Sequence, residues 1–144
     1  MGINHKSVST PIHGGLFHST CIFIATFICN ERGYKLKNTE SFASLFKCPG
    51  IPDIYIEYEY KGKDDYGKLR TIKQNVVIEI ETNLTNASEL KKSEQFTRPG
   101  LREPIIIDVG KGLDEFRKKK KDKGKEYGND VDLIYAYLDE RIVL

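Results

Sequence analysis

Residues 76–83 read VVIEIETN, the pattern of a strand in which two carboxylates stand two positions apart. Because side chains alternate between the faces of a strand, we expect Glu79 and Glu81 on the face opposite to Ile78 and Ile80. Like charges side by side on a mostly apolar strand repel each other and lose hydration unless something cationic compensates them. The stretch therefore predicts a buried strand and raises the question of what lies against its acidic face.

The residues around this strand predict an α/β fold, a central mixed sheet flanked by helices, in a single domain over 15–144 after a loose segment at 1–14. The expected order is helix, three strands, helix, strand, and then a C-terminal helix and strand. Asn86 or Ser88 is the expected cap of the second helix. The periodicity predicts helices over 15–32, 86–96 and 113–127, and strands over 34–37, 53–60, 68–82, 103–110 and 131–138.

Composition and length place few limits on function. The 144-residue chain has a net charge of only +2, so charge alone does not indicate a nucleic-acid-binding protein. Its three cysteines lack zinc-site spacing and are expected as buried thiols in a reducing cytoplasm, which would be the host cytoplasm for a viral protein. The apolar stretch 16–29 is too short to span a bilayer and predicts a buried helix, so neither a membrane partner nor an export signal is expected.

A basic run lies near the C-terminal end of the chain, where residues 117–125 read RKKKKDKGK. Such a run can bind nucleic acid by neutralising phosphates and releasing their counterions. The other interpretation is a solvated helix face with no partner. Further lysines and arginines fall within 61–73. In the first interpretation, the DNA-binding residues of the run are Lys118, Lys119, Lys120 and Lys121.

Three carboxylates are candidates for a metal site. Asp53 follows Pro52 at the start of one predicted strand, and Glu79 lies about 26 residues later in the next. Adjacent strands are about 5 Å apart, so these two side chains can approach one ion. Hard oxygen ligands suit Mg²⁺ or Mn²⁺, which activate water and stabilise charge on a phosphodiester. The alternative is that Glu79 and Glu81 lie on an open face of the sheet, paired with lysine or arginine.

The pair Pro52-Asp53, the stretch VIEIET at 77–82 and the order of elements together resemble the PD-(D/E)XK nuclease superfamily. That superfamily includes restriction endonucleases, Holliday-junction resolvases and small archaeal-virus nucleases. The resemblance implies a restriction-endonuclease-like core and an Mg²⁺- or Mn²⁺-dependent deoxyribonuclease without a small-molecule cofactor. Asp53 and Glu79 would be its metal ligands, with Glu81 assisting directly or through water. A homodimer would suit a duplex, which has two strands to cleave.

Two further residues enter through this resemblance. The family usually has a lysine where this chain has Glu81, and that lysine positions the attacking water. In relatives that resemble this pattern the lysine comes from the following helix, which makes Lys91 and Lys92 the candidates. The stretch GGLFH at 14–18 resembles a subgroup whose first helix adds a polar residue, here His18. A histidine near the start of an apolar helix is more often a structural or N-terminal polar residue than a catalytic one, and this is the other interpretation of His18.

Two other classes of function fit the same residues. Because the strand carries no lysine at Glu81, the chain can be a catalytically inactive DNA-binding or assembly module on the same fold. It can also be a structural protein whose acidic face pairs with lysines of another chain, in which case it would have no affinity for DNA.

Overall fold

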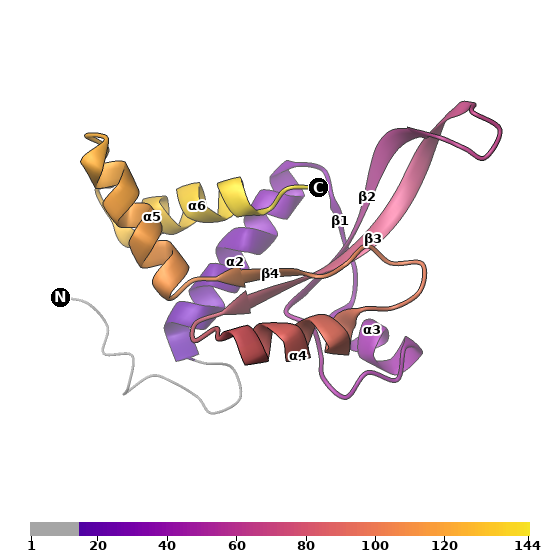
Figure 1. Cartoon of the computed structure of the whole chain (residues 1–144), viewed down its shortest axis with the longest axis horizontal. Coiled ribbons are helices and arrows are strands. Elements are labelled where there is room, and N and C mark those ends of the chain that lie inside the picture. The colour runs from indigo at the N-terminus through magenta and orange to yellow at the C-terminus, as the bar shows by residue number, and fades with distance from the viewer. Residues whose placement is uncertain (1–14) are drawn as a thin grey trace.

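The computed structural model describes residues 15–144, so the segment 1–14, with Gly14 of the GGLFH stretch, lies outside the described residues. The described part is an α/β fold in which a four-stranded mixed sheet is flanked by five helices (Figure 1). Its elements are α2 (Gly15–Glu31), β1 (Lys35–Leu36), α3 (Thr39–Leu45), β2 (Ile54–Lys63), β3 (Leu69–Glu81), α4 (Asn86–Phe96), β4 (Ile105–Asp108), α5 (Lys111–Asp122) and α6 (Asp130–Arg141).

The sheet has the order β1-β2-β3-β4. β1 pairs with β2 and β2 with β3 in antiparallel fashion, whereas β4 runs parallel to β3. The β2–β3 pairing extends from Ile54 opposite Ile78 to Lys63 opposite Leu69. α4 makes the crossover between β3 and β4, as a parallel connection requires. The strand predicted from VVIEIETN is therefore confirmed, with a neighbour on each side.

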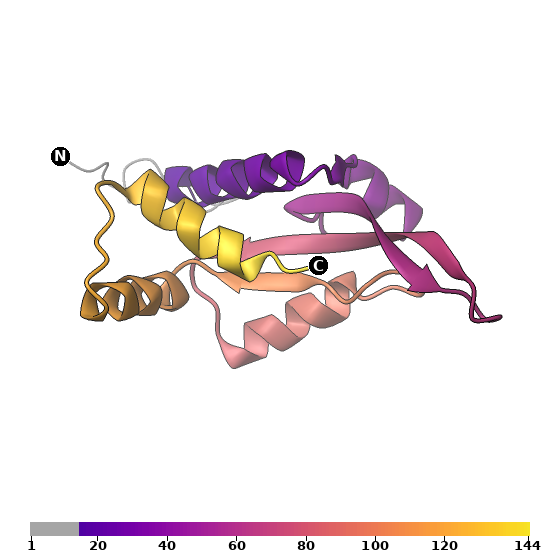
Figure 2. The ribbon, with the colours of Figure 1, turned by 90° about the horizontal axis from the view of Figure 1, so that it is seen from above.

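Side chains of β3 pack on both faces of the sheet. On one face, Ile78 and Ile80 belong to a core shared with α2, α5 and α6. On the other face, Val77 belongs to a smaller core with Phe42 of α3 and Phe96 of α4. Figure 2 shows α2 and α6 on one side of the sheet and α4 on the other. The acidic face of β3 is thus the face that α4 covers.

The prediction of a strand over 131–138 is wrong, because these residues lie in helix α6. The Asn129 side chain accepts a hydrogen bond from the Asp132 N–H and caps this helix. Apolar side chains recur at a spacing of four residues, from Leu133 to Tyr137 and from Ile134 to Leu138, and all four are buried on one face of the helix. The C-terminal part of the fold is therefore two helices rather than a helix and a strand.

Helix α3 was not predicted, and it interrupts the expected run of three strands. Asn38 caps it by accepting a hydrogen bond from the Ser41 N–H, and Phe42 is its one buried residue. The predicted helix 86–96 is confirmed, but its cap is Thr85 rather than Asn86 or Ser88.

Other sequence expectations concern the cysteines and the apolar helix. Cys21, Cys29 and Cys48 are all buried and free, as expected. The stretch 16–29 lies within the predicted first helix, α2. Across residues 15–144, no helix combines the length and the apolar character needed to cross a membrane.

Candidate functional site

Asp53 and Glu79 lie opposite each other where β2 begins, because the register of the β2–β3 ladder continues outward to this pair. Pro52 has no N–H to donate to the Ile80 carbonyl opposite it. The Ile80 N–H donates a 2.8 Å hydrogen bond to Asp53 Oδ2. Glu79 Oε2 in turn accepts a 3.1 Å hydrogen bond from the Asp53 N–H. Each carboxylate therefore holds the backbone of the opposite strand.

Glu79 is 1% exposed and is the only buried polar or charged residue within 15–144. Burial raises the pKa of Glu79 from an ordinary value of 4.5 to about 9, and the neighbouring Asp53 carboxylate adds to this increase. The positive charge of Lys92 acts in the opposite direction. Two carboxylates in contact at a desolvated position favour either a shared proton or a nearby cation.

Lys92 of α4 supplies a positive charge at this position. Its Nζ lies 3.7 Å from Glu79 Oε1 and 3.2 Å from Glu81 Oε1. Burial alone would lower the pKa of Lys92, but the two glutamates outweigh it and raise the pKa. The question raised by VVIEIETN has a structural answer, since the cationic group against the acidic face of β3 is this ammonium.

The position of Lys92 follows from how α4 begins and packs. The Thr85 hydroxyl accepts a hydrogen bond from the Ser88 N–H, and the Ser88 hydroxyl accepts one from the Thr85 N–H. Phe96 is buried against the sheet, and Lys92 lies one turn earlier on the same face, with Nζ 5.8 Å from the Phe96 ring centroid. Lys91 precedes it by one residue, a rotation of about 100°, and is exposed.

His18 reaches the site from α2, on the opposite side of the sheet. Its Nε2 lies 2.8 Å from the Ile80 carbonyl oxygen and 3.6 Å from Asp53 Oδ2. A contact with a carbonyl oxygen requires the proton on Nε2, so the ring donates to Ile80. Asp53 and His18 therefore hold the N–H and the carbonyl of the same residue. The structure brings together five of the sequence candidates: His18, Asp53, Glu79, Glu81 and Lys92.

The oxygen ligands needed for a metal ion are partly present at this site. Within residues 15–144, no group of three or more His, Cys, Asp and Glu side chains is placed to hold a metal ion. Asp53 and Glu79 nevertheless provide two adjacent carboxylates. Mg²⁺ is commonly bound by one or two carboxylates, with water and substrate phosphates completing its coordination. Asp53 and Glu79 can therefore supply two of the ligands of such an ion.

Asp108 is a carboxylate that the sequence analysis overlooked. It lies opposite Glu81 in the parallel β3–β4 pairing, so both side chains lie on the same face of the sheet. Its Oδ1 accepts a 2.7 Å hydrogen bond from the Gly110 N–H at the start of α5. The signal for it was an acidic residue at the carboxyl end of the apolar run IIID, where ligands of parallel strands gather.

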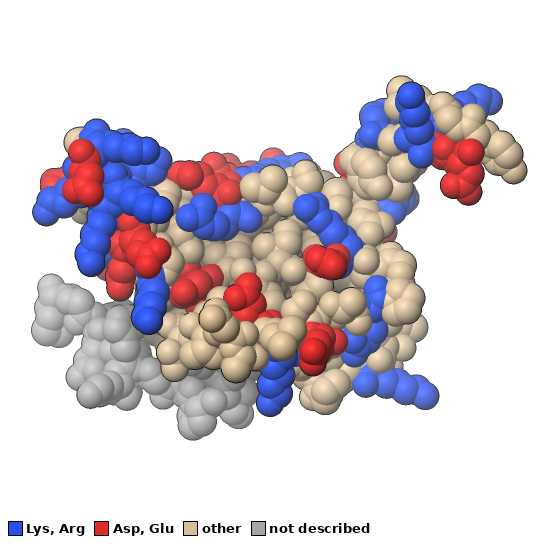
Figure 3. Space-filling model, viewed as in Figure 1, with Lys and Arg blue, Asp and Glu red and all other residues tan. Residues whose placement is uncertain are grey.

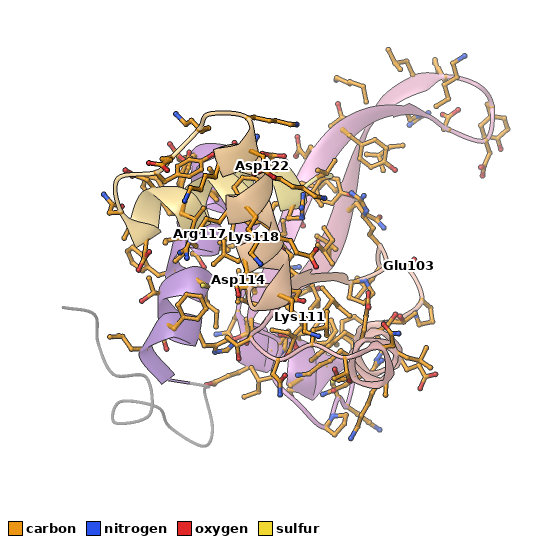
Figure 4. All side chains as sticks on the ribbon, turned by 60° about the vertical axis from the view of Figure 1, so that its left-hand side comes forward. Glu103, Lys111, Asp114, Arg117, Lys118 and Asp122 are labelled. Atoms are coloured by element: carbon orange, nitrogen blue, oxygen red, sulfur yellow. The ribbon has the colours of Figure 1, made fainter. Side chains whose placement is uncertain are left out.

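The basic run predicted at Lys118–Lys121 lies on α5, away from this cluster. Figure 4 shows Lys111, Asp114, Lys118 and Asp122 along the outer side of α5, so that lysines alternate with carboxylates. Lys120 forms an ion pair of 3.4 Å with Glu140, which binds it to α6. Acidic neighbours therefore offset part of the positive charge of the run. Figure 3 shows lysines and arginines over α5 and also over the far end of the β2–β3 hairpin.

Comparison with protein-family models, with curated proteins and with solved structures found no match to this chain.

Proposed function

We propose that this chain is a metal-dependent nuclease that hydrolyses phosphodiester bonds of DNA, as a member of the PD-(D/E)XK superfamily with a restriction-endonuclease-like core. The observation that carries the proposal is the approach of Lys92, from α4, to the carboxylates of β3 beside Asp53. A lysine in this place supplies the charge that the superfamily pattern has on the strand, where this chain has Glu81.

Asp53 and Glu79 would hold Mg²⁺ or Mn²⁺, and such an ion supplies Lewis-acid stabilisation of the phosphodiester and a more acidic water. The rest of the site positions these carboxylates. The hydrogen bond from the Ile80 N–H fixes Asp53 Oδ2, and the hydrogen bond from the Asp53 N–H fixes Glu79 Oε2. His18 holds the Ile80 carbonyl and so keeps the same segment of β3 in place.

Lys92 would orient the attacking water or stabilise the negative charge of the transition state, because its ammonium is held beside the carboxylates that would bind the metal. Glu81, with Oε1 3.2 Å from Lys92 Nζ, keeps this ammonium protonated and directed toward Glu79. Glu81 is then a positioning residue, with a water-mediated metal contact as its other role. The homodimer expected for a duplex substrate remains a prediction, which sedimentation of the purified protein would measure.

The test is cleavage of supercoiled, linear and branched DNA by the purified chain with Mg²⁺ or Mn²⁺. We expect Asp53→Asn and Glu79→Gln to abolish cleavage while the fold is retained. Lys92→Met should lower kcat by about 10²- to 10³-fold, the usual cost of losing one group that stabilises the transition state. Lys91→Met removes the same charge from the next residue and should cleave like the wild type. Full Mg²⁺-dependent activity in Glu79→Gln would reject the proposal.

A catalytically inactive DNA-binding or assembly module is the second candidate. The observation that favours it is that Lys92 already balances Glu79 and Glu81, so the acidic face needs no further cation. Isothermal titration calorimetry with Mg²⁺ and Mn²⁺ separates the two functions. DNA binding without nicking, together with no uptake of either metal, would establish the inactive module.

A further inference from the structure

We propose that the far end of the β2–β3 hairpin, residues 59–73, binds the phosphate backbone of duplex DNA through Lys61 and Lys63. We call this segment the distal hairpin. It projects away from the helices as a two-stranded extension of the sheet (Figures 1 and 2). The inference rests on the proposed function, because it assigns the distal hairpin to the DNA whose scissile phosphate would lie at Asp53 and Glu79.

One face of the distal hairpin is used for its own packing. The ring centroids of Tyr58 and Tyr60 are 6.0 Å apart. Ile72 of β3 is paired with Tyr60 of β2. Ile72 also covers Gly62, where a Cβ atom would lie only 2.6 Å from Ile72 Cδ1. Arg102 donates a hydrogen bond to the Tyr58 hydroxyl at the base. These contacts fill the face that continues from the Ile54 and Ile56 side of β2.

The other face carries cations and continues from the candidate site. Lys61 and Lys63 of β2 are an even number of residues from Asp53, and Lys73 of β3 is an even number of residues from Glu79. Because side chains alternate along a strand, these lysines lie on the site-bearing side of the hairpin. The Lys61 and Lys63 side chains are exposed. A DNA backbone that runs from the site along β2 would pass Glu57 and Glu59 on this side, the second beside Lys73, and would then meet positive charge at Lys61 and Lys63.

Of the three carboxylates of the distal hairpin, Asp64 is engaged in its structure, and Glu59 lies 4.0 Å from Lys73. Asp64 accepts hydrogen bonds of 2.9 Å from the N–H groups of Tyr66 and Lys68, and its other oxygen pairs with Arg70. It therefore shapes the turn and neutralises Arg70. Lys61 Nζ donates to the Thr71 hydroxyl at 2.5 Å, a neutral partner that leaves its charge available to an anion.

The length of the strand sets how far these lysines reach. Lys61 and Lys63 follow Asp53 by eight and ten residues, which corresponds to about 26 to 33 Å along a strand. Duplex DNA rises about 3.4 Å per base pair, so this distance covers roughly 8 to 10 base pairs. The distal hairpin can therefore contact phosphates that lie about one helical turn from a phosphate bound at Asp53.

The experiment compares Lys61→Ala/Lys63→Ala with the wild type and with Lys68→Ala. Lys68 is the control, because it is an exposed cation near the tip of the hairpin whose side chain is expected on the opposite face. Binding to a fluorescent 30-base-pair duplex is measured by anisotropy in EDTA between 50 and 200 mM salt. Losing two phosphate contacts should lower the slope of log K against log salt by about 1.8. The affinity ratio of wild type to double variant should then shrink about tenfold across this salt range.

A second readout uses cleavage with Mg²⁺. The double variant should lose kcat/KM on a 30-base-pair duplex but match the wild type on a duplex of about 6 base pairs, which is shorter than the roughly 8 base pairs between Asp53 and Lys61. A wild-type salt slope in the double variant, or an equal loss in Lys68→Ala, would overturn the inference. The absence of DNA binding by the wild type would also overturn it. A change in the oligomeric mass of the double variant in solution would overturn it as well, because the distal hairpin would then be a contact with a second copy of the chain.

The two proposals fail in different ways. If no protein cleaves DNA but the double variant alone loses salt-dependent binding, the distal hairpin is a DNA contact and the hydrolytic function is rejected. If cleavage requires Glu79 but is indifferent to Lys61 and Lys63 at both lengths, the nuclease remains and the role of the distal hairpin is rejected.

Discussion

The two ends of the β2–β3 hairpin have opposite environments although one continuous ladder joins them. At the Asp53 end, α2 and α4 cover the two faces of the sheet and bring His18 and Lys92 to the carboxylates. At the other end, none of the helices within residues 15–144 covers the strands, and the side chains of Lys61 and Lys63 are exposed. One strand pair therefore separates a desolvated acidic cluster from a solvated basic extension.

A charge has larger energetic consequences at the covered end of the hairpin than at the exposed end. A buried carboxylate such as Glu79 loses most of its hydration, so its partners determine whether the fold is stable. The exposed pair of Lys73 and Glu59, with 4.0 Å between nitrogen and oxygen, is worth about 0–1 kcal/mol. Substitutions at the covered end should change stability and chemistry together, whereas those at the exposed end should change binding alone.

The largest effect on stability is expected from the core beneath the site. Phe96→Ala removes a ring that is 1% exposed and packs with Val77 and Phe42. It should lower the free energy of unfolding by about 3–5 kcal/mol. Tyr66→Ala at the tip of the distal hairpin removes a ring that is 93% exposed and should change it by less than about 0.5 kcal/mol. Urea unfolding measures both, and equal losses would show that the two ends do not differ in packing.

A smaller effect is expected when Lys92 is removed. Lys92→Met leaves the Glu81 carboxylate, and Glu79 in its ionised form, without their cation, and because the Lys92 side chain is 34% exposed we expect a loss of about 1–3 kcal/mol rather than the full cost of breaking a buried pair. Lys91→Met should be nearly neutral. Urea titrations of both variants at pH 8 measure the contrast. A loss of stability in Lys91→Met as large as in Lys92→Met would contradict the assignment.

The antiparallel part of the fold could be predicted from sequence because its signals are local. Alternation in 53–60 and 68–82 with a turn between them fixes the hairpin, and the hairpin register brings Asp53 opposite Glu79. Residues 131–138 were predicted as a strand because strands are rich in Val, Ile and Tyr. Asn129 was nevertheless available as a helix cap. Helix α3 was not predicted because only Phe42 of its seven residues is buried, so its stability depends on the tertiary contacts of that ring.

Which lysine of 91–92 approaches the carboxylates depends on the rotation of α4 about its own axis. That rotation is fixed by the Thr85 cap and by the burial of Phe96, four residues after Lys92. The second of these signals was readable from the sequence as an i, i+4 pair. The position of Asp108 at the end of IIID was readable too, but its place beside Glu81 was not, because that follows from a parallel pairing that forms only after the α4 crossover.

The pH dependence of stability gives a sharper measure of the covered end. Burial raises the pKa of Glu79, so between pH 4.5 and about 9 the folded state holds a proton that the unfolded state has lost. The contribution of Glu79 is therefore fully present below pH 4.5 and is lost as the pH rises, by at most about 1.4 kcal/mol per pH unit. Glu79→Gln should remove this slope and become more stable than the wild type toward pH 9. Urea titrations from pH 5 to 9 in EDTA measure it, and a wild-type slope in Glu79→Gln would place the titrating group elsewhere.

The smallest effect is expected at the exposed end, and its size decides how the binding experiment is interpreted. Lys61→Ala/Lys63→Ala removes two solvated charges, and Lys61 contributes a single exposed hydrogen bond to Thr71. The free energy of unfolding should therefore stay within about 0.5 kcal/mol of the wild-type value at both pH 5 and pH 8. Thermal and urea unfolding of the double variant measure it. A neutral result means that lost affinity for DNA comes from lost phosphate contacts, whereas a loss of several kcal/mol would mean that the two lysines hold the hairpin together.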